Sequence, residues 1–327
     1  MMSKFGLAAM AIAALLTTSA PVTAQTIAGT LVTIPAGHDD DLRLFAPNGS
    51  VVKGVDALAR MHGADLVVWV AGNQFFAMED LVRTFVAQHG AASVGVVTLP
   101  PGLEFNAIMA GGFRYNGRDF PGLPDVFATI DLAPLRTMHE RGLASSYATY
   151  MHNELTLMVA KGNPDRITGI DDLGRADVRS SLPNPLTEGI MQFYARPVLQ
   201  RHGLYAKLTG GRECTACQTA PNVWFTAVHH RETPERIADG RSDVGIVWKT
   251  EAIAALKRGA PVEAVALPPA DSARDSVSYY IAPLTKARHP ELAAAYSAFV
   301  AAPAGQAVYI RYGFVGASDA ERAARSI

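Results

Sequence analysis

The feature that most constrains the fold is a regular alternation of short apolar segments with longer segments of helical periodicity. The segment "ADLVVWVAG" (64–72) is a short apolar run that ends at a glycine, as a buried strand does. The next segment, "QFFAMEDLVRTFVAQHG" (74–90), has apolar residues at helical spacing and closes on Gly90. Because this alternation continues to residue 314, the sequence predicts an α/β fold with mainly parallel sheets flanked by helices.

The remaining segments follow the same pattern, except at the start of the chain. Residues 25–62 carry turn signals such as "PNGS" and are predicted to be an irregular extension. Further strands are predicted at 93–100, 124–131, 155–164, 243–248, 262–268 and 276–284, and further helices at 104–112, 133–143, 169–178, 189–204, 234–240, 251–259 and 290–314.

The first residues have the pattern of a cleaved secretory signal peptide. Lys4 precedes an apolar run from Leu7 to Leu16, and small residues allow cleavage after Ala24. The run has about ten residues, whereas a transmembrane helix needs about 20. We therefore expect residues 1–24 to be removed and the mature chain to be free in a bacterial periplasm, with an uncleaved anchor as the alternative.

Composition excludes several classes of function. About 300 residues remain after cleavage, enough for two domains or one large one. The formal net charge of -1 gives no electrostatic case for binding nucleic acid or an anionic membrane. The chain has no G-x-S-x-G, P-loop, H-E-x-x-H or dinucleotide fingerprint, so no enzyme class is indicated and no cofactor is expected.

The two cysteines, Cys214 and Cys217, lie together in "GRECTACQT". In an oxidising compartment a local disulfide is the leading interpretation. Two alternatives stay open. The first is a metal or ligand contact that includes His229 and His230, a short loop further on. The second is redox chemistry.

Polar loops follow most of the predicted strands. In open parallel sheets, ligands bind beyond the carboxyl ends of the strands, where loops lead into helix N-termini. These loops lie at 71–76, 100–105, 128–131, 184–189, 227–234 and 247–252. Several helix N-termini that converge offer free N–H groups and partial positive charge, which suits an anion.

The adjacent pair His229-His230 lies in the fifth of these loops. Neighbouring side chains point about 100° apart on a helix and to opposite faces of a strand, so the two rings are poorly placed to chelate one ion. The following Thr-Pro-Glu predicts a helix with Thr233 as N-cap and Pro234 as its first residue. We predict that His230 contacts the ligand, supported by His229 or Arg231, and that its protonation below about pH 6.5 strengthens anion binding.

The loops also occur in a familiar order. The segments "LVVWVAGNQFFAMEDLVRTF", "PDVFATIDLAPLRTMHERGL", "SSLPNPLTEGIMQFYARPVL" and "GRSDVGIVWKTEA" together resemble the molybdate-binding proteins of ABC importers, within the type II periplasmic binding fold. The resemblance implies two α/β lobes with a ligand cleft between them. Lobe 1 would take residues 63–150 and 265–327, lobe 2 residues 151–264, and residues 25–62 would be an N-terminal extension.

The resemblance also implies the ligand residues. The family's first serine falls at about Asn73, its second at Gly102 or Leu103, and its third-loop backbone donor near Glu188. Its tyrosine falls at Trp248, and a count back from there places the fourth position on His230. With neighbours in the same loops, the predicted ligand set is Asn73, Gln74, Leu103, Thr129, Thr187, Glu188, His229, His230 and Trp248.

This chain departs from the family at those positions, because the hydroxyls and the phenol are absent and a carboxylate is present. Glu188 repels a dianion unless it is protonated, paired or turned away, while Arg231 and Lys249 offer compensating charge. Trp248 has an indole N–H and a flat apolar face, which suits an organic or larger ligand. In the structural alternative, Phe75, Phe76 and Trp248 pack the hinge.

Two functions follow from these patterns. The favoured one is a monomeric solute-binding protein that delivers a small oxyanion, an organic acid or a metal complex to an ABC permease in the inner membrane. The alternative is a periplasmic accessory protein that holds a metal ion for delivery. That protein would use Cys214, Cys217, His229 and His230 as ligands.

Overall fold

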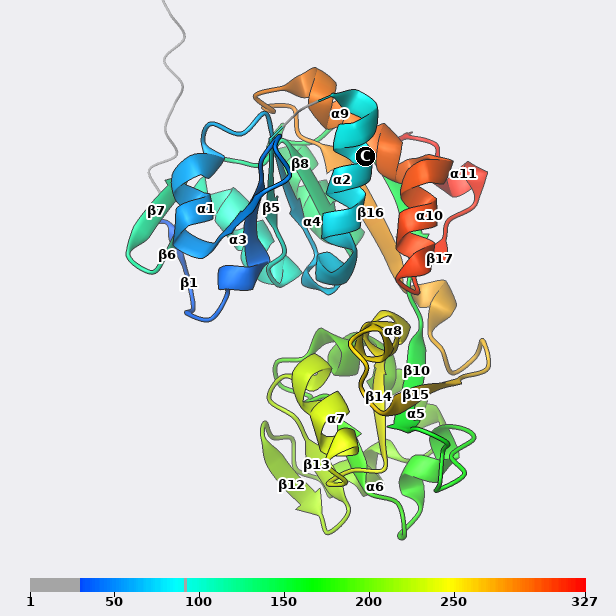
Figure 1. Cartoon of the computed structure of the whole chain (residues 1–327). Helices are drawn as coiled ribbons and strands as arrows, with labels where there is room; N and C mark the ends of the chain where they lie inside the picture. The colour runs from blue at the N-terminus through cyan, green and yellow to red at the C-terminus, as the bar shows by residue number, and fades with distance from the viewer. Residues whose placement is uncertain (1–29, 91–92) are drawn as a thin grey trace, which may run out of the picture.

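The chain forms two lobes, each built on one large β-sheet (Figure 1). The computed structural model describes residues 30–90 and 93–327, without the side chain of His230. The predicted signal peptide, residues 1–24, lies outside the described residues. The upper lobe in Figure 1 contains the N-terminal and C-terminal parts of the described chain, and the lower lobe contains its middle.

The first lobe contains a nine-stranded sheet in the order β17-β9-β16-β8-β4-β5-β2-β3, with β18 paired to β9. Only β5, β4 and β8 run parallel, and the other pairs are antiparallel. The strands are β2 (Leu42–Phe45), β3 (Val51–Lys53), β4 (Leu66–Val70), β5 (Val94–Val97), β8 (Val126–Thr129), β9 (Ser146–His152), β16 (Ser278–Pro283), β17 (Val315–Gly316) and β18 (Arg325–Ser326). A small separate sheet contains β1 (Val32–Ile34), β6 (Gly112–Tyr115) and β7 (Arg118–Pro121).

The second lobe contains a six-stranded sheet in the order β12-β13-β11-β14-β10-β15. Parallel pairing is again confined to its middle, here β13, β11 and β14. The expectation of mainly parallel sheets therefore holds only for the central strands, and both sheets are mixed. The strands are β10 (Leu155–Ala160), β11 (Ser180–Leu182), β12 (Cys217–Ala220), β13 (Val223–Phe225), β14 (Val244–Trp248) and β15 (Val262–Ala266).

Helices cover both sheets. Those of the first lobe are α1 (Gly54–Met61), α2 (Met78–His89), α3 (Pro101–Ala110), α4 (Leu132–Glu140), α9 (Pro290–Ala301), α10 (Pro303–Arg311) and α11 (Asp319–Arg322). Those of the second are α5 (Arg196–Arg201), α6 (Tyr205–Thr209), α7 (His229–Ala238) and α8 (Lys249–Lys257). Short 3-10 helices lie at Asp39–Asp41, Gly72–Ala77, Ile170–Gly174 and Arg274–Ser276, and a π-helical turn at Ile190–Ala195 precedes α5. Within residues 30–90 and 93–327, no helix is long and apolar enough to span a bilayer.

The prediction that residues 25–62 are irregular is wrong for the described part. Strand β2 pairs antiparallel with β5, with Leu42 opposite Val97, and α1 follows β3. All four residues of β2 are buried. The strand has only four residues, Leu-Arg-Leu-Phe, and its charged Arg43 is buried, so its sequence pattern is too short and too polar to indicate a buried strand. The strand covers an edge of the parallel core that would otherwise be open to pairing with another chain.

The chain crosses between the lobes twice, from β9 to β10 and from β15 to β16. Helix α8 contacts the first lobe beside these crossings. The Arg258 guanidinium lies 5.7 Å from the ring centre of Phe76, and the Lys257 ammonium lies 3.6 Å from that of Tyr312. Gly313 leaves room for Ile253 of α8, because a Cβ at Gly313 would lie 2.4 Å from its Cδ1.

Candidate functional site

The predicted ligand residues fall in two groups, one in each lobe. We call Asn73 and Thr129, which lie at the ends of β4 and β8, the first-lobe wall, and the segments 184–189, 227–229 and 248–251 the second-lobe wall. Charged groups of each lobe shift the pKa of a group in the other lobe. A hydrogen bond from Lys53 is the main cause that lowers the pKa of Asp40, and the charge of Arg231 in the second lobe lowers it further. Burial raises the pKa of Tyr194 in the second lobe to about 12, and Asp131 in the first lobe adds to the rise.

The first-lobe wall contains polar atoms without partners. The Asn73 Nδ2 donates to the Tyr279 hydroxyl, but its Oδ1 is buried and has no hydrogen-bond partner among the described residues. Thr129 ends β8, is completely buried, and has a hydroxyl that also lacks a partner there. Leaving such a buried group unpaired costs about 1–3 kcal/mol. Both atoms therefore stand to gain from a polar ligand or a water molecule.

The other two predicted residues of the first lobe face its core. Gln74 is completely buried, and its Oε1 accepts from the hydroxyls of Tyr150 at 2.7 Å and Tyr309 at 2.8 Å. These contacts give the Gln74 oxygen a structural role, while its Nε2 is buried without a partner among the described residues, so the predicted ligand contact of Gln74 stays a prediction. Leu103 is half-buried in the first turn of α3 and packs against the core.

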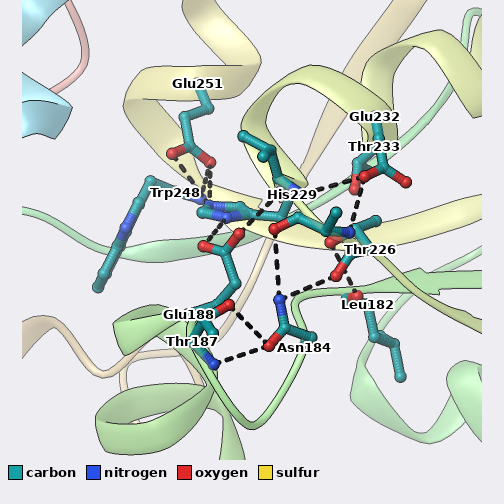
Figure 2. Close-up of polar contacts among 12 residues, drawn as sticks. Leu182, Asn184, Thr187, Glu188, Thr226, His229, Glu232, Thr233, Trp248 and Glu251 are labelled. Carbon is teal, nitrogen blue, oxygen red and sulfur yellow. Dashed lines mark hydrogen bonds and ion pairs between the residues drawn. The ribbon is translucent and has the colours of Figure 1, made fainter. Parts of the chain in front are cut away.

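The second-lobe wall is organised around a buried histidine between two carboxylates (Figure 2). The His229 Nδ1 lies 2.7 Å from Glu188 Oε2, and its Nε2 lies 3.0 Å from Glu251 Oε2. Glu188 Oε1 also accepts the backbone N–H of His229, and Glu251 Oε2 accepts that of Trp248 at 3.1 Å. The two carboxylates thus share the charge of one imidazolium, and each occupies the N-terminal end of a helix, α7 or α8.

The two carboxylates keep His229 protonated. Burial alone would lower the pKa of His229, but the charges and hydrogen bonds of Glu251 and Glu188 outweigh burial and raise the pKa to about 10. Because both ring nitrogens carry a proton and face a carboxylate, this ring is poorly suited to bind a metal ion, which requires a neutral imidazole.

Helix α7 begins earlier than the sequence predicts. It starts at His229 with Val228 as N-cap, so the prediction of Thr233 as N-cap and Pro234 as first residue is wrong. The helix start is stabilised instead by Glu232, whose Oε1 accepts the backbone N–H groups of Ala227 and Val228. Pro234 lies inside the helix, where it leaves one carbonyl without its usual donor.

The Thr233 hydroxyl faces Ser181 of β11 at 3.2 Å, which ties α7 to the sheet. Gly245 of β14 allows this packing, because a Cβ there would lie 2.3 Å from Thr233 Cγ2. His230 and Arg231 follow in the first turn of α7. Arg231 is exposed, and the side chain of His230 lies outside the described part of the structure.

Asn184 is a residue of this wall that the sequence analysis missed. Its Nδ2 donates to the carbonyls of Thr226 and Ala227, and its Oδ1 accepts the backbone N–H groups of Leu186 and Thr187. Asparagine before proline is a turn signal that could have identified it, since its side chain often bonds the backbone two residues on. Glu251 was missed too, although a Glu three residues after a helix N-cap is half of a capping box.

Trp248 lies at the edge of this wall and is only 5% exposed. Its ring centre lies 5.2 Å from that of Tyr194 in an edge-to-face arrangement. Two large apolar side chains that precede Tyr194 in sequence are exposed, Leu186 at 52% and Phe193 at 66%. Thr187 is exposed between Leu186 and Glu188. The aromatic edge of the wall is therefore mostly packed, and its loop offers apolar surface as well as polar groups.

The cysteine pair lies next to the wall. Cys214 and Cys217 are joined by a disulfide, and both side chains are half-buried. Among the residues that the structure describes, no three or more His, Cys, Asp or Glu side chains are placed to hold a metal ion.

Two cavities lie elsewhere. One of about 310 Å³ is lined by Arg179, Arg236 and Arg241, and one of about 540 Å³ lies between β9, α9 and α11.

Comparison with known proteins agrees with this architecture. A family model described as bacterial extracellular solute-binding protein matches residues 66–315. Molybdate-binding protein ModA of Mycobacterium tuberculosis is 23% identical over 220 residues, which are 65% of this chain and 74% of that protein.

Two solved structures have the same fold. The periplasmic molybdate-binding protein of Azotobacter vinelandii has a TM-score of 0.58 and 20% identity, covering 77% of this chain and all of that one (100%). The substrate-binding protein of an ABC transporter from Agrobacterium tumefaciens has a TM-score of 0.59 and 15% identity, covering 86% of each chain.

Proposed function

The chain belongs to the bacterial extracellular solute-binding proteins, and from that premise we propose that it captures a small solute between its lobes for an ABC importer. The observation that carries the proposal is the arrangement of the two walls at the ends of β4 and β8 in one lobe and of β11, β13 and β14 in the other. Ligands of such sheets bind at this position.

The proposal includes a division of the chain and a location. The first lobe comprises residues 63–150 and 265–327, extended by β2, β3 and α1, and the second comprises residues 151–264. Residues 1–24 direct export to the periplasm. There the chain acts as a monomer that meets the permease in the inner membrane.

The first candidate for the solute is a small molybdate-like oxyanion. Relatives from Mycobacterium tuberculosis and Azotobacter vinelandii are named as molybdate-binding proteins. Glu188 meets part of the condition under which a carboxylate tolerates a nearby anion, because it is paired with the His229 imidazolium, whose single charge it shares with Glu251. The exposed Arg231 adds positive charge at the start of α7. In the first lobe, the Thr129 hydroxyl has no partner among the described residues and can donate to an oxyanion once binding opens its completely buried position.

No observation favours the metal-delivery alternative. The thiols it requires are joined in a disulfide, and the ring of His229 is engaged by Glu188 and Glu251. We therefore carry the oxyanion proposal alone to experiment.

Thermal unfolding with sodium molybdate, tungstate and sulfate tests the proposal. An anion present at a hundred times its dissociation constant stabilises the folded protein by about 2.7 kcal/mol. Small-angle scattering with that anion should give a smaller radius of gyration as the lobes close. If no anion raises the melting temperature, the proposal that the solute is an oxyanion is wrong. If amino acids, sugars and metal chelates also fail, capture of a solute is wrong as well.

A further inference from the structure

The disulfide loop, residues 214–217, is connected to the second-lobe wall through one side chain. Thr215 lies between the two cysteines, and its hydroxyl donates to Asn184 Oδ1 at 3.1 Å. The same oxygen accepts the backbone N–H of Thr187 at 2.8 Å and of Leu186 at 3.1 Å. A single acceptor thus joins the disulfide loop to the loop that presents Thr187 and Glu188.

The amide of Asn184 also reaches the third segment of the wall. Its Nδ2 donates to the carbonyl of Thr226 at 2.9 Å, and Ala227 lies next in the chain before the N-cap of α7. Because donors surround the oxygen and carbonyls face the nitrogen, the amide fits in one orientation only. Asn184 is fully buried, so water does not compete for these bonds.

The disulfide constrains the position of Thr215. Ala216, the other residue between the cysteines, has a φ of 49°, in the left-handed region that alanine seldom adopts. Cys217 also begins β12 and pairs with Phe225, the residue before Thr226. The loop is therefore held at both ends, and a freed loop would allow Ala216 to relax and Thr215 to move away from Asn184.

From these contacts we infer that Asn184 is a positioning residue for the ligand, and that the Cys214–Cys217 disulfide maintains the wall through Thr215. This inference rests on the proposed function, because it assumes that the second-lobe wall contacts the solute. Asn184 fixes the backbone of Leu186 and Thr187, which leads into Glu188, and it bonds the carbonyls that precede α7, so it acts on the solute through these neighbours.

Substitutions at Thr215 test the inference without disturbing the core, since Thr215 is exposed. Thr215→Val removes the hydroxyl and keeps the shape, and Thr215→Ser restores the donor. The first measurement is amide hydrogen exchange at Leu186 and Thr187 in the full chain without ligand. We expect exchange to be roughly fivefold faster in Thr215→Val, normal in Thr215→Ser, and the melting temperature to be unchanged.

The disulfide is tested by a double-mutant cycle. Cys214→Ser with Cys217→Ser should accelerate the same amides at least as much, and adding Thr215→Val should cause little further change. A general stabilising role of the disulfide would instead give additive effects. Additive effects, or unchanged exchange in Thr215→Val, would overturn the inference.

The second measurement is calorimetric titration with sodium molybdate. If the wild type binds, Thr215→Val should bind roughly fivefold more weakly and Thr215→Ser normally. Equal affinity in Thr215→Val despite faster exchange would show that the loop does not position the ligand. If the wild type does not bind molybdate, the oxyanion proposal fails, while the exchange data still decide whether the disulfide maintains the wall.

Discussion

The two walls differ in how fully their polar groups are satisfied. In the first lobe, Asn73 Oδ1 and the Thr129 hydroxyl are buried and lack partners among the described residues. In the second lobe, Glu188, His229 and Glu251 bond one another and two backbone N–H groups. One wall therefore has unused hydrogen-bonding capacity, whereas the other uses its strongest polar groups to fix its own shape.

This difference suggests a division of labour during binding. An oxyanion that enters the first lobe can pair with the Thr129 hydroxyl and recovers that part of the cost, which favours initial binding there, whereas Asn73 Oδ1 is an acceptor and needs a donor such as water. The second-lobe wall is preorganised and can close on the solute with little loss of conformational entropy. Substitutions in the first wall should then change affinity more than stability, and substitutions in the second wall should do the reverse.

The largest expected effect is the loss of stability in Glu251→Ala. Removing this carboxylate leaves the buried His229 imidazolium with only one negative partner, Glu188, in this cluster, and it leaves the backbone N–H of Trp248 without its acceptor. Breaking a buried ion pair in this way costs about 3–5 kcal/mol, measurable by urea unfolding. The matched control is Glu235→Ala, an exposed residue of α7 whose loss should cost less than about 0.5 kcal/mol. Equal costs for the two variants would contradict the comparison.

The next effect is a loss of stability at alkaline pH. The folded pKa of His229 is raised to about 10, above the unfolded value near 6.5. A raised pKa stabilises the folded state fully below pH 6.5, and that contribution is lost as the pH rises through 10. Stability should therefore fall by roughly 2–3 kcal/mol between pH 7 and pH 9, measured by urea unfolding. His229→Gln should show little of this slope, and an equal slope in both proteins would assign it to another group.

The sequence predicts the elements whose signal is local. The apolar run at 64–72 contains β4, and the run at 124–131 contains β8, because buried strands need only a short apolar segment. The start of α7 was missed because part of its stabilisation comes from Glu188, 41 residues away in sequence. The contact of Gln74 with Tyr150 was missed for the same reason, since Tyr150 is 76 residues away. A polar loop residue looks identical in sequence whether its partner is a solute or a distant tyrosine.

A smaller effect compares two buried threonines, one in each lobe. Thr129→Val removes a hydroxyl without a partner, so stability should stay constant or rise by up to about 1 kcal/mol. Thr233→Val removes a hydroxyl that faces Ser181 at 3.2 Å, so stability should fall by about 1 kcal/mol. Thermal unfolding measures both changes. Molybdate affinity should fall in Thr129→Val and recover in Thr129→Ser. If Thr129→Val lowered stability and Thr233→Val did not, the contrast between the two lobes would be refuted.

The smallest expected effect concerns His230, the second residue of α7. The raised pKa of His229 keeps its ring protonated from pH 5.5 to pH 8, so His229 contributes nothing to a change in binding over that range. An ordinary histidine titrates near pH 6.5, and a unit charge near an anion in a partly exposed site contributes about 1 kcal/mol. Molybdate affinity should therefore rise about fivefold from pH 8 to pH 5.5 if His230 contacts the ligand, and His230→Ala should abolish the rise. A metal ligand would instead bind more weakly at low pH, because the proton competes for the same nitrogen. If His230→Ala keeps the full pH dependence, the titrating group lies elsewhere in the walls, and the second-lobe wall acts through its fixed shape alone.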